Sequence, residues 1–234
     1  MSGDWVDKPV RSIGSIDLII FDFDGTIVDS APTVGAIIGL LRHSLGKPPL
    51  DGQLLYKWIS AGGQELMRHT LDVTEVEAQK HLETFRRIYG AISTPPGSLY
   101  DGVVECIRSA RTAGLKTAIC TNKPAPLVKK IVGELGLDEL FDAVHSGDSF
   151  ANKKPDPEMI THCIAGLNVH RENTVLVGDS LVDQNAARRA GVPFIWHTEG
   201  YDDGVDQNAG DLSFKRYSEL SNWLELPAVR SKTT

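Results

Sequence analysis

The segment LIIFDFDGT, residues 18–26, decides the fold. Its four apolar residues, Leu18 to Phe21, end abruptly at Asp22. A continuous apolar run of this length is typical of a strand buried on both faces of a parallel sheet. Ligands of such sheets bind beyond the carboxyl ends of the strands, so Asp22 and the residues after it are the first candidates for a site.

Similar apolar segments recur along the chain and are separated by segments with helical spacing. This alternation, with short connections, predicts an α/β fold whose core is a doubly wound (Rossmann-like) parallel sheet. The other predicted strands cover residues 116–120, 143–145, 174–177 and 194–196, of which 143–145 is the weakest. The predicted core helices include residues 103–110, 159–167 and 183–190.

One interval breaks this alternation. About ninety residues separate Thr26 from the strand near Lys116, whereas a crossover needs about a dozen residues including its helix. The excess, residues 31–94, has helical spacing of apolar residues almost throughout. We therefore predict a small α-helical cap domain at 31–94, inserted after the first strand into a core made of 1–30 plus 95–234.

Composition excludes several classes of protein. The chain has 234 residues, 41% of them hydrophobic and 24% charged, with a net charge of −7. These values suit a globular protein and give no overall basic footprint for nucleic acid. The uncharged stretch of residues 30–41 is much shorter than the ~20 apolar residues that cross a membrane. We therefore expect neither nucleic acid nor a membrane as a partner.

The compartment is predicted from two further features. Residues 1–11 contain charged residues and no apolar core segment, which is unlike a signal peptide. Cys106, Cys120 and Cys163 are odd in number and far apart, so they form no disulfide framework. Both features favour the cytoplasm, while the oligomeric state stays open between a monomer and a weak dimer.

Four groups of polar residues follow predicted strands or precede a helix. Each alone has a common explanation as a turn, a helix cap or a solvated flank. Together at one sheet edge they indicate a site, because the carboxyl ends of parallel strands meet there. The groups are Asp22 with Asp24, Thr121 with Asn122, Lys153 with Lys154, and Asp179 with Asp183.

The charges of these groups indicate a metal. Asp22, Asp24, Asp179 and Asp183 would place four carboxylates in one crevice, with Lys154 to offset them. Like charges a few ångströms apart disfavour joint ionisation, and a hard divalent cation with oxygen ligands removes the conflict. We predict Mg2+ as the cofactor and metal-assisted phosphoryl transfer as the chemistry.

The same residues carry a family resemblance. DFDGTIVDS (22–30), TN (121–122), KKP (153–155) and VGDSLVD (177–183) resemble the four motifs of haloacid dehalogenase superfamily phosphatases that have a helical cap. A closer likeness is to the phosphoglycolate phosphatase branch. It is carried by DSAP (29–32), WISAGGQELMRHTL (58–71), TNKP (121–124), NKKPDP (152–157) and EGYDDG (199–204).

The resemblance implies a role for each core residue. Asp22 would be the nucleophile that becomes a phospho-aspartyl intermediate, and Asp24 the general acid and base. Thr121 and Asn122 would place the phosphoryl oxygens, and Lys154 would neutralise their charge. The implied Mg2+ ligands are the Asp22 carboxylate, the Asp24 backbone carbonyl, Asp179 and Asp183.

The resemblance also implies that a loop between cap helices enters the site. Gly62 and Gly63 are the candidates, with Arg68 as a possible partner of a substrate carboxylate. The equal alternative is that the two glycines form only an interhelical turn and that Arg68 is a solvated side chain.

We therefore expect a Mg2+-dependent phosphatase for a small phosphate ester, with 2-phosphoglycolate as the leading substrate. Alternatives are a phosphomutase with the same nucleophile, and a phosphatase for a sugar phosphate, a nucleotide or pyrophosphate. A catalytically inactive relative that uses the cleft for binding is a third class, although the intact Asp22, Asp24, Lys154 and Asp179 argue against it.

Overall fold

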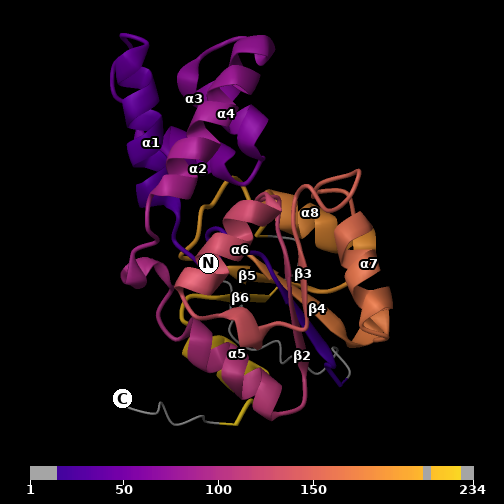
Figure 1. Ribbon diagram of the computed structural model, residues 1–234. Coiled ribbons are helices and arrows are strands. Elements are labelled where there is room, and N and C mark those ends of the chain that lie inside the picture. Colours follow the sequence, from indigo (N-terminus) through magenta and orange to yellow (C-terminus); the bar gives the residue numbers. More distant parts are fainter. Residues whose placement is uncertain (1–14, 208–211, 228–234) are drawn as a thin grey trace, which may run out of the picture.

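The computed structural model describes residues 15–207 and 212–227 and contains one parallel six-stranded sheet (Figure 1). The strand order is β3-β2-β1-β4-β5-β6, and every neighbouring pair is parallel. This arrangement confirms the predicted doubly wound α/β core. The strands are β1 (Leu18–Phe21), β2 (Lys116–Cys120), β3 (Ala143–His145), β4 (Thr174–Gly178), β5 (Phe194–His197) and β6 (Leu212–Phe214).

β1 lies in the middle of the sheet, between β2 and β4, and all four of its residues are buried. From β1 the chain adds β2 and β3 on one side, and later adds β4, β5 and β6 on the other. The strand order therefore reverses between β1 and β4. In open α/β sheets this reversal leaves a crevice at the carboxyl ends of the two strands, where ligands bind.

Helices cover both faces of the sheet. Ile19 and Phe21 of β1 pack into a cluster with α5, α6 and α9, whereas Leu18 and Ile20 pack against α7 and α8. Alternate residues of one strand thus contribute to opposite cores. These helices are α5 (Val103–Thr112), α6 (Ala125–Glu134), α7 (Glu158–Gly166), α8 (Leu181–Ala190) and α9 (Tyr217–Trp223), with short 3-10 turns at Pro96–Ser98, Asp138–Leu140 and Arg171–Asn173.

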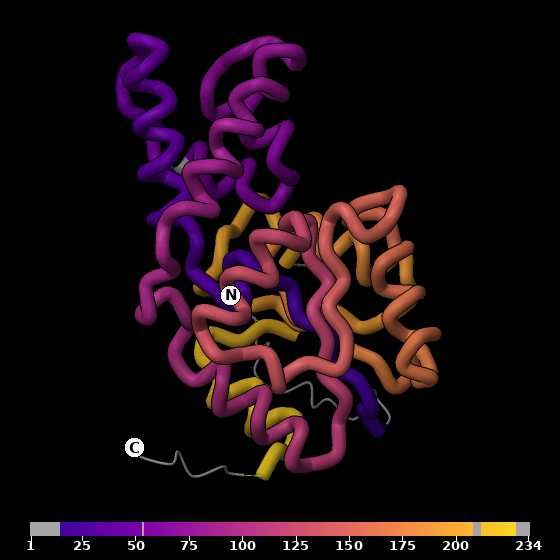
Figure 2. Tube along the Cα trace, in the orientation of Figure 1, coloured from indigo at the N-terminus to yellow at the C-terminus, as the bar shows by residue number. Residues whose placement is uncertain are grey.

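The first part of the segment between β1 and β2, residues 31–91, forms four helices that lie together beside the core (Figures 1 and 2). Thr74 caps α4 in a capping box with Glu77, in which each side chain bonds to the other residue's backbone N–H. The apolar faces of these helices join the same cluster as one face of the sheet. The four helices are α1 (Ala31–Ser44), α2 (Gly52–Ile59), α3 (Gly63–Leu71) and α4 (Glu75–Ala91).

β6 and α9 were not predicted. β6 has three residues, Leu212 to Phe214, with a serine between its two apolar residues, and it lies at the edge of the sheet. A segment this short carries too little pattern to be separated from a loop. α9 has seven residues, and of these the structure buries Tyr217 and Leu220.

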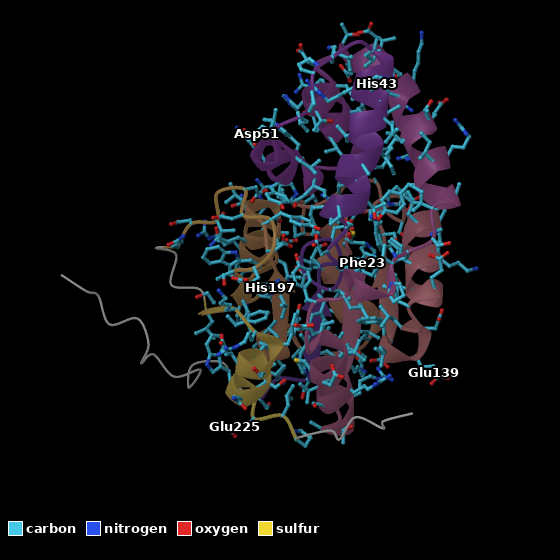
Figure 3. All side chains as sticks on the ribbon, turned by 90° about the vertical axis from the view of Figure 1, so that its left-hand side faces the viewer. Phe23, His43, Asp51, Glu139, His197 and Glu225 are labelled. Atoms are coloured by element: carbon cyan, nitrogen blue, oxygen red, sulfur yellow. The ribbon has the colours of Figure 1, made fainter. Side chains whose placement is uncertain are left out.

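No helix in the described ranges is long and apolar enough to cross a membrane. The three cysteines are free and buried. The sequence-based interpretation of residues 1–11 lies outside the described residues. Figure 3 shows Phe23 and His197 in the interior, with His43 on the cap helix α1.

Candidate active site

Asp22 is held at the point where the strand order reverses. Its backbone N–H donates to the carbonyl of Val177 at 2.9 Å, which extends the pairing of β1 with β4 beyond the end of β1. The Asp22 carboxylate is buried, and Asp24, two residues later, is 15% exposed at its side chain. The strand end thus directs two carboxylates to one edge of the sheet.

Gly25 makes the turn after Asp24 possible. Its φ of +83° lies in the left-handed region, and a Cβ there would be 2.1 Å from Oδ2 of Asp179. Only glycine combines that backbone conformation with so close an approach. The next residue, Thr26, donates from Oγ1 to Oδ1 of Asp179 at 2.8 Å, so the turn also positions a carboxylate from β4.

Asp179 and Asp183 come from the end of β4 and the first turn of α8. The Tyr201 N–H donates to Oδ2 of Asp179 at 2.7 Å. Asp183, the third residue of α8, forms a capping box with Ser180 and accepts from Oγ of Ser180 at 2.6 Å. Oxygens of Asp22, Asp179 and Asp183 lie within 4.8 Å of one another, so three chain segments converge on one point.

Lys154 lies between two of these carboxylates. Its Nζ is 2.6 Å from Oδ1 of Asp22 and 2.5 Å from Oδ1 of Asp183, and all three side chains are buried. Asn122 fixes the Lys154 backbone, because its Oδ1 accepts from the Lys154 N–H at 2.9 Å and its Nδ2 donates to the Lys154 carbonyl at 3.0 Å. The neighbouring Lys153 is exposed.

Burial and repulsion dominate the electrostatics of this cluster. Burial, with the nearby Asp183 charge, raises the pKa of Asp22 to about 7, although Lys154 opposes the shift. Burial and the same aspartate raise the pKa of Asp179 well above its ordinary value. Burial alone would lower the pKa of Lys154, but Asp183 and Asp22 outweigh it and raise that pKa, so the ammonium stays charged.

The donor set fits a metal ion. One ammonium pairs with two of the three buried carboxylates, and the oxygens of all three are close enough to ligate one cation. A divalent cation would relieve the repulsion that raises the pKa values of Asp22 and Asp179. Asp22, Asp179 and Asp183 are therefore the residues that could hold a metal here.

A pocket with an empty volume of about 640 Å³, partly open to solvent, extends from this cluster to the cap. Its core side includes Asp22, Asp24, Thr121, Asn122, Lys154 and Asp183, and its cap side includes Gly62, Gly63, Leu66, Leu82, Phe85 and Arg86. The pocket is charged at the sheet edge and largely apolar under the cap. This arrangement suits a small anionic ligand whose reacting group lies against the sheet.

Two of the three predicted cap residues line this pocket and one does not. Gly62, with a φ of +100°, precedes α3, and Gly63 packs so closely on Leu82 that a Cβ would lie 2.6 Å from its Cδ1. Arg68 is outside the described pocket lining, and its Nη2 donates to Oε2 of Glu65 at 2.8 Å on a surface where its side chain is 43% exposed. The structure therefore brings the glycines to the site and leaves Arg68 away from it.

Sequence reasoning missed Lys123 and Tyr89. Nζ of Lys123 is 2.8 Å from Oδ1 of Asp24 and 3.3 Å from the hydroxyl of Tyr89, a residue of α4. Lys123 directly follows Thr121 and Asn122, so its position in that motif was a signal. Tyr89 lies seven residues after Leu82 on a helix, which places both on one face.

Tyr201 connects the acidic cluster to the beginning of the cap. Its hydroxyl donates to Oδ1 of Asp29 and accepts from the N–H of Ala31, both at 2.9 Å. Its ring stacks on Tyr56 of α2 with 5.4 Å between centroids. Because its own N–H bonds to Asp179, one residue contacts the carboxylate cluster, the first cap connection and a cap helix.

Comparisons with known proteins agree with this geometry. The sequence model of the haloacid dehalogenase-like hydrolase family matches residues 19–197. The chain is 34% identical over 214 residues to a phosphoglycolate phosphatase of Colwellia psychrerythraea, covering 87% of this chain and 95% of the relative. A phosphoglycolate phosphatase of Psychrobacter arcticus is 33% identical over 218 residues, covering 88% and 95%.

Solved structures of similar proteins share the fold of this chain. A crystal structure of a predicted phosphoglycolate phosphatase from Haemophilus somnus superposes with a TM-score of 0.83 at 27% identity, covering 90% of this chain and 98% of that one. CbbY from Rhodobacter sphaeroides in complex with xylulose-(1,5)bisphosphate has a TM-score of 0.71 at 24% identity, covering 88% and 96%, and shows the fold alone. The chain belongs to the haloacid dehalogenase-like hydrolase family, which confirms the resemblance in its motifs.

Gly25→Ala tests whether the turn positions the acidic cluster. We expect a loss of about 1 kcal/mol or more in the free energy of unfolding, because alanine at this φ is strained and its Cβ would displace Asp179. Catalytic activity should fall as well. Urea denaturation measures the first effect. Gly39→Ala is the control, since nothing lies within 4 Å of a Cβ there, and equal stability of both variants would contradict the role of Gly25.

Proposed function

We propose that this protein is a Mg2+-dependent phosphatase that hydrolyses 2-phosphoglycolate through a phospho-aspartyl intermediate. Family membership and the similarity to phosphoglycolate phosphatases identify the chain as a phosphoric monoester hydrolase. The observation that carries the finer proposal is the pair of carboxylates, Asp22 and Asp24, that face one pocket beside the buried ammonium of Lys154.

In the first half-reaction, a carboxylate oxygen of Asp22 attacks phosphorus. The new bond joins that oxygen to phosphorus, the bond from phosphorus to the substrate alcohol breaks, and Asp24 gives its proton to the departing oxygen. In the second, Asp24 takes a proton from a water molecule that attacks phosphorus. The bond to Asp22 then breaks and inorganic phosphate leaves, which restores both carboxyl groups.

The remaining residues position and neutralise the phosphoryl group. Lys154 balances the charge on Asp22 and on the phosphoryl oxygens, and Thr121 lies at the pocket to donate from its hydroxyl. The side-chain amide of Asn122 already donates to the carbonyls of Lys154 and Ser60, so Asn122 would contribute its backbone N–H. Mg2+ would be held by Asp22, Asp179, Asp183 and the backbone carbonyl of Asp24. When bound, it supplies positive charge to the phosphoryl oxygens.

In this proposal the chain divides into a core of residues 1–30 plus 95–234 and a cap of residues 31–94. The cap side of the pocket is largely apolar, with Leu66, Leu82 and Phe85, and would exclude water during the reaction. A cytoplasmic location belongs to the same proposal, and the three free cysteines support it.

A substrate panel tests the proposal. Phosphate release should be faster with 2-phosphoglycolate than with sugar phosphates, nucleotides or pyrophosphate. Chelation of Mg2+ should lower the rate of release at least about 100-fold. Equal rates of release from every ester would contradict the assignment of 2-phosphoglycolate as the substrate. Transfer of phosphate between sugar positions without release would instead support a phosphomutase.

Asp22→Asn tests the nucleophile. We expect turnover of 2-phosphoglycolate to fall at least about 1,000-fold, because an amide cannot form the acyl phosphate. The fold should persist, since the substitution removes one charge from a repulsive cluster. Asp138→Asn, at an exposed position, is the matched control and should leave turnover unchanged. Substantial residual activity of Asp22→Asn, measured by phosphate release, would refute the assignment.

The metal affinity should depend on pH. In the metal-free protein, burial raises the pKa of Asp22 to about 7, so this carboxyl is mostly protonated at pH 6 and mostly ionised at pH 8. Because a ligating carboxyl must lose its proton, we expect Mg2+ to bind about tenfold more weakly at pH 6. Titration calorimetry measures the affinity at both pH values. Asp22→Asn should flatten the dependence, and an equal affinity of the unmodified protein at both values would contradict the expectation.

A further inference from the structure

Lys123 is a buried lysine that the proposed reaction does not use. It follows Asn122 in the connection after β2, and its side chain is only 7% exposed. Its Nζ pairs with Oδ1 of Asp24 at 2.8 Å and lies 4.5 Å from the centre of the Tyr89 ring. An ammonium buried to this extent requires compensation, and Asp24 and the cap tyrosine provide it.

The hydrogen-bonding capacity of Lys123 is not filled. An ammonium has three N–H donors, and the described part of the chain gives it two acceptors, Oδ1 of Asp24 and the Tyr89 hydroxyl. Lys123 also lines the pocket, together with Asp22 and Asp24. A ligand in the pocket can therefore provide the third acceptor, and a negatively charged oxygen would be preferred.

Its distance from Asp24 determines which part of a substrate Lys123 can reach. The oxygen that leaves phosphorus must lie about 2.6–3.2 Å from the Asp24 carboxyl that protonates it. Nζ of Lys123 is 2.8 Å from that carboxyl. In an ester with one carbon between the leaving oxygen and a carboxylate, ordinary bond lengths put the carboxylate oxygens about 3 Å from the leaving oxygen. A carboxylate at this position is within reach of Lys123.

We propose that Lys123 selects substrates with a carboxylate one carbon from the phosphate ester, by binding that carboxylate while it remains paired with Asp24. This inference rests on the proposed function and names the residue that recognises the end of the substrate opposite to phosphorus. Tyr89 holds the ammonium from the cap helix α4, so the cap contributes to this recognition without contacting the carboxylate.

Arg86 is the cation that the cap contributes to the described pocket lining. It is exposed, on α4, and the described residues offer it no ion pair. An exposed guanidinium at the pocket mouth would suit an anionic group farther from phosphorus, as in a bisphosphate. Lys123 is buried beside the acid that protonates the leaving oxygen, so it is better placed for a short substrate.

The test compares 2-phosphoglycolate with ethyl phosphate, which has the same two-carbon chain and no carboxylate. The measured quantity is the ratio of the two kcat/KM values. Lys123→Gln should reduce this ratio about 10- to 100-fold, the effect of losing one charge-assisted hydrogen bond. Arg87→Gln, an exposed neighbour outside the pocket lining, is the control and should keep the ratio of the unmodified protein. A ratio unchanged by Lys123→Gln, or lost in Arg86→Gln instead, would overturn the proposal.

A second measurement does not depend on folding of the Lys123 variant or on turnover. Binding of 2-phosphoglycolate and of its neutral amide, 2-phosphoglycolamide, is measured by calorimetry on Asp22→Asn with Mg2+. The carboxylate should bind at least about tenfold more tightly, and equal affinities would overturn the role of Lys123. If Asp22→Asn instead retained turnover, the proposed nucleophile would fail while a preference for the carboxylate still supported Lys123.

Discussion

The structure of the site depends on one buried ammonium, Lys154, between the carboxylates of Asp22 and Asp183. The two acids come from segments far apart in the chain, the end of β1 and the first turn of α8. Removing this ammonium would leave two buried carboxylates without compensation, which costs several kcal/mol. The close approach also constrains the backbone: a Cβ at Gly178 would lie 2.6 Å from the Cβ of Asp183, and one at Gly200 would lie 2.2 Å from the Cβ of Asp179. Glycine at these positions is therefore a consequence of the charge cluster.

The same cluster is connected to the cap by polar contacts at three places. Tyr201 bonds to Asp179 and to the first residues of the cap connection, Asn122 donates to the carbonyl of Ser60 at 3.3 Å, and Lys123 contacts Tyr89. All three core residues follow strands whose carboxyl ends meet at the site. A change in the position of the cap would therefore move residues that contact the acidic groups. This physical connection gives a small helical insert influence over the chemistry beneath it.

Much of this architecture could be predicted from sequence because its determinants are local. The apolar run at 18–21 is followed by Asp22, and a parallel sheet brings the carboxyl ends of its strands together irrespective of the loop conformations. The contact of Lys123 with Tyr89 could not be predicted, since it joins residues 34 positions apart across the boundary of core and cap. Arg68 shows a second limit of prediction from sequence, which concerns the direction of a side chain. Leu66, Met67, Thr70 and Leu71 form the buried face of α3, so a residue can lie near the right loop and still point to the surface.

The charges of the pocket explain why recognition and chemistry would depend on each other. The four carboxylates of Asp22, Asp24, Asp179 and Asp183 face two buried lysines, Lys154 and Lys123. A divalent cation would balance the acids at the phosphate end, whereas Lys123 is the balancing charge beside Asp24. A carboxylate bound there brings the leaving oxygen to Asp24 in the same step. Free energy gained by binding the carboxylate end of the substrate would then be used to place the leaving oxygen beside its proton donor. A substrate without that carboxylate would therefore have a lower kcat as well as a lower affinity.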